Sequence, residues 1–425
     1  MINERLRLRF VAPLRPKTPP SGLDGEVAFL PMEAIGEDGS YDHSSKRPAA
    51  EVASSGYTYF KEGDVVRARV TPCFENGKGA LLSSLAGGRG VGTTELFVFE
   101  PSPRIDPRFL YYVTISRDFT EQGTATMYGA HGVRRVDDQF VRDYRVWVPP
   151  VSTQRAIAVH LDRETARIDA LIASKRRIVE LLGERWQTVI HDAAAGRLGD
   201  HQASRRASGL AWLEDVPAHW EEGQLKLVAK LGSGHTPSRS HPNWWANPTI
   251  PWITTGEVAQ MRSDKIELIT ETRERISEIG MANSAAELHP AGTVVLCRTA
   301  ASAGYSAIMG RDMATSQDFA TWTCGPRLNP RFLLLCLRAM RQDLLGRLAM
   351  GSTHKTIYMP DIESIAVPLP PPSEQLELVE AANVQQGNLD ACVTRICRQI
   401  DLLEDRRQAV ISAAVTGQLD VPEAA

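Results

Sequence analysis

Few residues in this 425-residue sequence have the types and spacing that catalysis requires. The loop Asn76-Gly77-Lys78-Gly79 has no hydroxyl residue after the lysine and no glycine before it at the spacing of a nucleotide-binding loop. Gly232-Ser233-Gly234 lacks the third glycine and the strand-to-helix context of a dinucleotide loop. Its neighbours His235 and His241 form a loose cluster, but their Gly/Pro-rich surroundings favour solvated loop residues over a metal site.

Other catalytic motifs are also missing from the sequence. There is no Gly-x-Ser-x-Gly elbow and no His-Glu-x2-His pair. Asp106-Pro107-Arg108 and Asn329-Pro330-Arg331 do not supply the Pro-Pro-aromatic motif of an amino-methyltransferase. The six cysteines are scattered without a Cys-x2-Cys pair, so we expect reduced, mostly buried thiols. We therefore predict no active site and no metal in this chain.

The composition indicates a globular protein of two domains. The chain is 43% apolar and 23% charged, and no apolar run approaches the 18 residues of a membrane span. Residues Met1 to Phe10 lack the apolar core of a secretory signal, so we expect a cytoplasmic protein with no membrane partner. Because the net charge is −3, any surface for a polyanion must be local.

An internal repeat reveals the elements that must position the functional residues. Pro149-Pro150-x-Ser152-x-Gln154 returns as Pro370-Pro371-x-Ser373-x-Gln375, at an offset of 221 residues. The same offset pairs Gly196-x-Leu198 with Gly417-x-Leu419, so about 50 residues share one register. A match of this length does not arise by chance.

Both copies of the repeat are predicted to form long helices with an apolar seam of heptad spacing. Proline and serine at each start favour helix initiation, and Gly196 and Gly417 favour termination. Because the two helices are equivalent, we expect them to pair as an antiparallel coiled coil with internal pseudo-two-fold symmetry. The predicted seam consists of Leu161, Ile168, Leu171, Ile178, Leu182, Val189, Leu389, Val393, Ile396, Ile400, Leu403 and Val410.

The segments before each helix are related more distantly. Asp106 to Leu110 matches Asn329 to Leu333 at an offset of 223, and Gly63 to Val66 matches Gly292 to Val295 at an offset of 229. Two binding heads of different specificity would keep these matching segments and differ in their surface residues. Strands are expected over Asp64 to Val70, Glu95 to Phe99, Thr293 to Cys297 and Phe319 to Thr323, and helices over Pro107 to Ile115 and Pro330 to Leu345.

The predicted fold class is α+β, with two mixed α/β heads in tandem, each followed by a long α-helix. The expected boundaries are 1–149 for the first head, 150–198 for the first helix, 199–219 for a polar linker, 220–370 for the second head and 371–420 for the second helix.

This order of elements resembles the specificity subunit of a type I restriction-modification system. The Pro-Pro-x-Ser-x-Gln helix starts and the endings Arg185 to Ile190 and Arg406 to Ile411 carry the resemblance. Four segments of the heads also resemble recurrent patterns of the family. They are Thr71 to Gly79, Thr93 to Leu96, Gly232-x-Gly234-x-Thr236-Pro237 with Ile250 to Ile253, and Gly351-Ser352-Thr353-x-Lys355. The resemblance covers nearly the whole chain and depends on the combination of motifs.

The resemblance implies a non-catalytic subunit that binds double-stranded DNA at a bipartite, asymmetric site, with each target-recognition domain reading one half. It implies two methyltransferase subunits and restriction endonuclease/translocase subunits as partners. S-adenosylmethionine, ATP and Mg would then be bound by those partners, and this chain would hold no cofactor.

Contacts with DNA require basic or amide side chains at phosphates and groove edges. Residues 1–150 contain 19 basic and 19 acidic residues, so a basic face must come from how the fold distributes them. Arg134 and Lys355 are equivalent in the repeat, which makes their loops the preferred pair. The predicted DNA-binding residues are Lys78, His131, Arg134, Arg135, Arg298, His354 and Lys355.

Two other functions stay open at this stage. A coiled-coil adaptor or scaffold with two protein-binding heads would show no salt-dependent binding of duplex DNA. A nuclease with an unrecognised site would use scattered acidic residues such as Glu95 and Asp318. The sequence does not give the target bases or the gap between half-sites, and it does not separate a type I system from related methylation-based defence systems.

Overall fold

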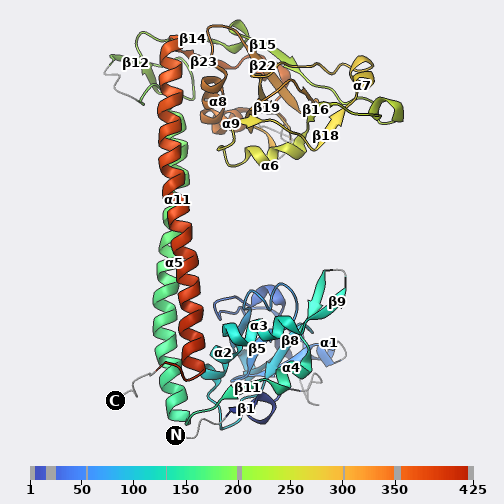
Figure 1. Cartoon of the computed structure of the whole chain (residues 1–425), viewed down its shortest axis with the longest axis vertical. Helices are drawn as coiled ribbons and strands as arrows, with labels where there is room; N and C mark the ends of the chain where they lie inside the picture. The colour runs from blue at the N-terminus through green and yellow to red at the C-terminus, as the bar shows by residue number, and fades with distance from the viewer. Residues whose placement is uncertain are drawn as a thin grey trace. The chain divides into compact units, whose positions relative to one another are not determined.

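The computed structural model describes residues 5–15, 25–53, 56–130, 132–198, 203–299, 302–348 and 356–419. The chain divides into two compact units: unit 1 is Met1–Arg176 with Cys397–Ala425, and unit 2 is Arg177–Ile396. Each unit contains one head of strands and short helices and a part of each of two long helices (Figure 1). The expected class of two mixed α/β domains in tandem with long helices is confirmed at this level.

The head of unit 1 contains a four-stranded and a three-stranded sheet, besides the two-stranded pairs β1-β11 and β10-β9. One has the order β3-β2-β7-β4 and the other the order β6-β5-β8. The central strand β5 is buried at all four of its residues and pairs antiparallel with β6 and β8. The strands are β1 (Arg5–Arg7), β2 (Glu26–Leu30), β3 (Lys46–Pro48), β4 (Thr58–Lys61), β5 (Val65–Ala68), β6 (Gly79–Leu81), β7 (Arg89–Gly92), β8 (Leu96–Phe99), β9 (Tyr128–Ala130), β10 (Val133–Arg135) and β11 (Arg145–Trp147).

Short helices cover the β5 sheet of unit 1. The predicted helix over Pro107 to Ile115 is confirmed as α2, and it begins there because the Asp106 carboxylate accepts hydrogen bonds from the N–H groups of Arg108 and Phe109. Phe109 is fully buried beneath it. The short helices of unit 1 are α1 (Ala49–Ala53), α2 (Pro107–Ile115), α3 (Arg117–Ala125) and α4 (Asp138–Asp143).

The head of unit 2 contains a five-stranded sheet of order β15-β22-β19-β20-β17 and a three-stranded sheet of order β18-β16-β21. The predicted helix over Pro330 to Leu345 is two helices, because the chain leaves helical geometry at Met340. The strands are β14 (Glu221–Gln224), β15 (Ala229–Ser233), β16 (Ile250–Ile253), β17 (Leu268–Ile269), β18 (Glu274–Ile276), β19 (Val294–Cys297), β20 (Ser306–Met309), β21 (Ala314–Thr315), β22 (Phe319–Cys324) and β23 (Ala366–Leu369). The short helices are α6 (Val258–Met261), α7 (Glu278–Ala282), α8 (Pro330–Ala339), α9 (Arg341–Leu348) and α10 (Met359–Glu363).

The two long helices are α5 (Val151–Ala194) and α11 (Pro372–Val415), each of 44 residues. Gly196 and Gly417 end them with positive φ angles of 66° and 76°, which favour glycine. A Cβ at Gly196 would lie 2.6 Å from the Trp220 ring, and one at Gly417 would lie 3.0 Å from the Trp147 ring. The predicted stop signals are therefore also packing positions.

The duplication is preserved in the hydrogen bonds at the start of each long helix. Gln154 accepts from the Asp106 N–H at 2.7 Å and donates to two backbone carbonyls, those of residues 104 and 149. Gln375 accepts from the Asn329 N–H at 2.7 Å and donates to the carbonyls of residues 327 and 370. Both glutamines are fully buried, so the same residue attaches each head to its following helix.

The predicted apolar seam is wrong at two positions of α5. Leu171 is 46% exposed and Ile178 is 42% exposed. The residue after each of them is less exposed: Ile172 is 6% exposed and Val179 is half-buried. The reason is the register of the repeat: Ile172 and Val179 are equivalent to Val393 and Ile400, the seam residues of α11. Of the other predicted seam residues, Leu161, Ile168 and Val189 are buried, and Leu182, Leu389, Val393, Ile396, Ile400, Leu403 and Val410 are half-buried.

Side chains of α5 and α11 contact each other inside unit 1. In unit 1 the Lys175 Nζ donates to the Gln399 side chain at 2.6 Å, and Arg407 forms an ion pair with Asp169 at 2.9 Å. In unit 2 residues of both helices belong to one hydrophobic core, which includes Trp186 of α5 and Leu378 of α11.

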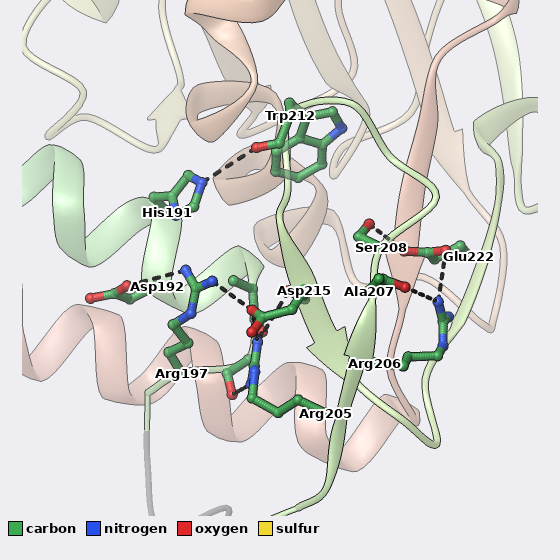
Figure 2. Close-up of polar contacts among 12 residues, drawn as sticks. His191, Asp192, Arg197, Arg205, Arg206, Ala207, Ser208, Trp212, Asp215 and Glu222 are labelled. Carbon is green, nitrogen blue, oxygen red and sulfur yellow. Dashed lines mark hydrogen bonds and ion pairs between the residues drawn. The ribbon is translucent and has the colours of Figure 1, made fainter.

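Within the predicted linker over 199–219, the strands β12 (Arg205–Ala207) and β13 (Asp215–Pro217) form a β-hairpin. Figure 2 shows the guanidinium groups of Arg197 and Arg205 converging on the Asp215 carboxylate, at 2.6 and 2.8 Å. Leu213 and Val216 are buried in the core of unit 2. The polar residues of this segment bind one another, and a few apolar residues anchor the hairpin.

Two further observations concern exposure. The described cysteines are not mostly buried: Cys297 and Cys336 are buried, but Cys392 and Cys397 lie exposed on α11. Within the described ranges, no helix combines the length and apolar character that crossing a membrane would demand.

Candidate nucleic-acid interface

The hairpin of β9 and β10 in unit 1 carries two of the predicted DNA-binding residues, Arg134 and Arg135 (Figure 1). It is fixed to the loop that follows β5. Val70 pairs with Arg135 in a single antiparallel bridge, and the Thr71 N–H donates to the Arg134 carbonyl at 2.9 Å. The hairpin leaves Tyr128 58% exposed. This hairpin and the Thr71–Gly79 loop therefore form one continuous surface.

Both arginines of the hairpin contact carboxylates, but in different ways. Arg135 donates from Nε and Nη2 to Glu95, with its closest contact at 2.7 Å, and this pairing raises the pKa of Arg135. Arg134 has one looser ion pair, with Glu75 at 3.6 Å. The guanidinium of Arg135 is thus held in one orientation, whereas that of Arg134 is less constrained.

At the end of β19, unit 2 has the same backbone hydrogen bonds that unit 1 has at the end of β5, and we call this arrangement the shared frame. The Arg298 N–H donates to the Asp318 carbonyl at 2.8 Å, as the Arg69 N–H donates to the Glu95 carbonyl at 3.0 Å. The Ile357 N–H donates to the Arg298 carbonyl at 2.7 Å, as the Val136 N–H does to Arg69 at 2.9 Å. The two heads therefore share one backbone arrangement at this edge.

The side chains on the shared frame differ between the heads. Thr356 takes the position of Arg135 and pairs with Thr299. The carboxylate of Asp318, equivalent to Glu95, accepts from the hydroxyls of Thr299 at 2.9 Å and Ser316 at 3.1 Å. The frame holds a guanidinium in unit 1 and hydroxyl groups in unit 2. Glu95 and Asp318, the acidic residues of the nuclease alternative, both serve to anchor neighbouring side chains.

Two other predicted residues are engaged inside their heads. The Lys78 ammonium donates to the Met32 carbonyl at 3.2 Å. Arg298 donates to the carbonyls of Gln317 at 3.0 Å and Ile357 at 3.3 Å. Both side chains are half-buried, so they support loops of their own head. His131, His354 and Lys355 lie outside the described residues.

The sequence prediction missed two buried arginines beneath the unit 1 surface. Arg67 is fully buried and donates to the Phe74 carbonyl at 2.7 Å and the Thr120 hydroxyl at 3.1 Å, which fixes the Thr71–Gly79 loop to α3. Burial lowers its pKa to about 10. Arg69 forms an ion pair with Asp138 at 2.7 Å. Its equivalence to Arg298 at the offset of 229 is the signal that could have identified it.

A separate exposed group in unit 2 combines aromatic and basic residues. Arg239 lies over the Trp245 ring at 4.6 Å, and the His241 ring stacks on Trp244 at 4.3 Å. Stacked basic and aromatic side chains are common where proteins contact nucleic acids. His235 and His241 are both exposed, as expected for solvated loop residues.

Comparison with known families gives a match over the second head. Residues 217–383 match the type I restriction modification DNA specificity domain. Over 164 residues the chain is 35% identical to the specificity subunit of the type I restriction enzyme EcoAI from Escherichia coli, and over 157 residues it is 36% identical to that of EcoEI from the same organism. The matches cover 38% and 36% of this chain but only 28% and 26% of those relatives.

Comparison with solved structures extends over the whole chain. One similar chain comes from work on complex assembly and conformational transition of the type I R-M system, with a TM-score of 0.68 and coverage of 98% of both chains. The HsdS subunit from Thermoanaerobacter tengcongensis has a TM-score of 0.54, covering 98% of this chain and 97% of its own. At 19% identity in both cases, these likenesses show a shared fold.

Proposed function

From the match of residues 217–383 to the type I restriction modification DNA specificity domain, we propose that the whole chain is a specificity subunit that reads a bipartite, asymmetric DNA site. The observation that carries the proposal is the frame shared by both heads. The same chain contains one head that matches a DNA specificity domain and a second head with the same strand-end hydrogen bonds and different side chains. Each head would read its own half-site.

The long helices would set the distance between the half-sites. We infer that α5 and α11 pair along their length as an antiparallel coiled coil, with a pseudo-two-fold axis relating the two repeats. Support comes from the contacts inside unit 1 and from the matching attachment of Gln154 and Gln375. At 1.5 Å per residue, helices of 44 residues would span roughly 65 Å.

The chemistry would belong to partner proteins. The chain would recruit two adenine methyltransferase subunits and, in the full complex, restriction endonuclease/translocase subunits. Those partners would bind S-adenosylmethionine, ATP and Mg, and this chain would be non-catalytic.

The proposal is tested by sequencing the DNA methylation of a host that carries this gene with its neighbouring methyltransferase gene. The control is the same host lacking only this gene. We expect N6-methyladenine at one gapped, bipartite motif to depend on the gene. If the methylation pattern is unchanged while both proteins are expressed, the chain does not determine specificity, and the adaptor function becomes the better account.

A further inference from the structure

The side chain of Arg135 is oriented more firmly than that of its neighbour. Its Nε lies 2.9 Å and its Nη2 lies 2.7 Å from the Glu95 carboxylate. The backbone of Glu95 is itself held, since its N–H donates to the Thr93 hydroxyl at 3.3 Å and its carbonyl accepts from Arg69. The backbone of Arg135 is fixed by its bridge to Val70. Both ends of the ion pair are therefore attached to the head.

One edge of the Arg135 guanidinium remains available. Glu95 uses the edge formed by Nε and Nη2, and no residue in the described part of the chain accepts a hydrogen bond from Nη1. The Arg135 side chain is 42% exposed. The remaining edge, Nη1 with the second N–H of Nη2, presents two parallel donors. Two parallel donors fit two neighbouring acceptors, as on a phosphate or on the major-groove edge of guanine.

The carboxylate of Glu95 favours guanine over phosphate. It neutralises the charge of Arg135 and would repel a phosphate, but it leaves the donors of the free edge in place. The β-hairpin that carries Arg135 also has a suitable shape, because the major groove admits a two-stranded β-ribbon. Arg134 is different: its side chain is 50% exposed, and its Nη2 lies 3.6 Å from Glu75. A loosely held cation of this kind suits a phosphate.

We propose that Arg135, oriented by Glu95, donates paired hydrogen bonds to O6 and N7 of one guanine in the half-site read by unit 1. This assignment rests on the proposed function and adds a base and a residue to it. Glu95 is the positioning residue, and Arg134 contacts the DNA backbone. Unit 2 carries Thr356 at the position of Arg135, so its half-site makes no equivalent contact.

The test uses the complete chain with its methyltransferase partner and duplexes that contain the motif found by methylation sequencing. Each guanine of the motif is replaced in turn by 7-deazaguanine, which lacks the N7 acceptor. We expect the replacement at one position in one half-site to lower the affinity for the duplex about tenfold or more. The variant Arg135→Lys keeps the charge but loses the fixed planar pair of donors, so the difference in affinity between the normal and modified duplexes at that position should become much smaller. Glu95→Gln should reduce the same discrimination in part.

Arg134→Lys is the matched control, and it should retain full sensitivity to 7-deazaguanine. Unchanged discrimination at the other half-site shows that Arg135→Lys is folded. The assignment is overturned if no guanine of either half-site is sensitive, or if Arg135→Lys and Arg134→Lys keep the same sensitivity. A wild-type complex that methylates no gapped motif would instead overturn the proposed function itself, which is a distinguishable result.

Discussion

Two buried glutamines connect the heads to the long helices, and each makes three hydrogen bonds to backbone groups. Replacing Gln154 by alanine would leave one N–H and two carbonyls without their partner in a buried site. Because unsatisfied buried polar groups are costly, we expect Gln154→Ala to lower the free energy of unfolding of unit 1 by about 2–4 kcal/mol. Gln375→Ala should have an effect of the same size in unit 2, as measured by urea unfolding.

The control for this comparison is Gln385→Ala, which removes an exposed glutamine of α11. Its effect should stay within about 0.5 kcal/mol. If Gln154→Ala is no more destabilising than Gln385→Ala, the buried hydrogen bonds do not hold the head to the helix.

Asp215 makes the hairpin of unit 2 sensitive to acid. Its hydrogen bond with Arg205, assisted by Arg197, lowers the pKa of this carboxylate to about 2. A carboxylate with a lowered pKa stabilises the folded state at pH values above its unfolded pKa of about 3.9, and this contribution is lost as the pH falls toward 2. Asp215→Asn should therefore weaken hydrogen-exchange protection of residues 203–217 at pH 7.

The difference between Asp215→Asn and the wild type should shrink as the pH is lowered from 4 to 2. Asp192→Asn is the matched control, because its carboxylate lies 3.9 Å from Arg197 and should contribute little. A difference that persists unchanged at pH 2 would mean that the ion pair is not the cause.

The DNA-binding side chains could be predicted from the sequence only in part, because charge does not reveal a residue's partner. Arg134 and Arg135 lie on an exposed hairpin, whereas Lys78 and Arg298 donate to carbonyls of their own heads. Nothing local in the sequence distinguishes these cases. Arg67 was missed for the same reason, since it stands among apolar strand residues where no burial of a charge is expected.

At the scale of elements, the α5 helix offers a direct test of the buried stripe. Ile172 is 6% exposed and its neighbour Leu171 is 46% exposed, so two adjacent aliphatic residues should respond differently to the same substitution. We expect Ile172→Ala to lower the free energy of unfolding by about 2–4 kcal/mol, because it leaves a cavity. Leu171→Ala should change it by about 0.5 kcal/mol or less. Urea unfolding followed by circular dichroism measures both, and equal effects would contradict the corrected register.

The long helices, their end glycines and several strands of the heads were predictable because repeated sequence and apolar spacing act locally. The stripe on α5 was misplaced by one residue because Leu171 and Ile178 are as apolar as Ile172 and Val179, and only comparison with α11 separates them. The hairpin over Arg205–Pro217 was missed because its stability comes from long-range contacts with the unit 2 core.

For the whole molecule, the division into two units predicts how the chain unfolds. Phe109 and Phe332 are equivalent in the repeat, and each is fully buried in the core of a different unit. Removing either ring should cost about 3–5 kcal/mol in its own core. If the units unfold separately, Phe109→Ala lowers the transition temperature of unit 1 alone by roughly 10 °C, and Phe332→Ala does the same for unit 2.

Differential scanning calorimetry, with hydrogen exchange to assign each transition, distinguishes separate unfolding of the two units from unfolding of the whole chain in one step. Unfolding in one step has a physical basis, because α5 and α11 each continue from one unit into the other and helix formation is cooperative. A single transition that both variants lower equally would mean that the helices transmit unfolding between the units. Two transitions, each shifted by one variant, would mean that each head keeps its own stability, as expected if each head reads its half-site independently.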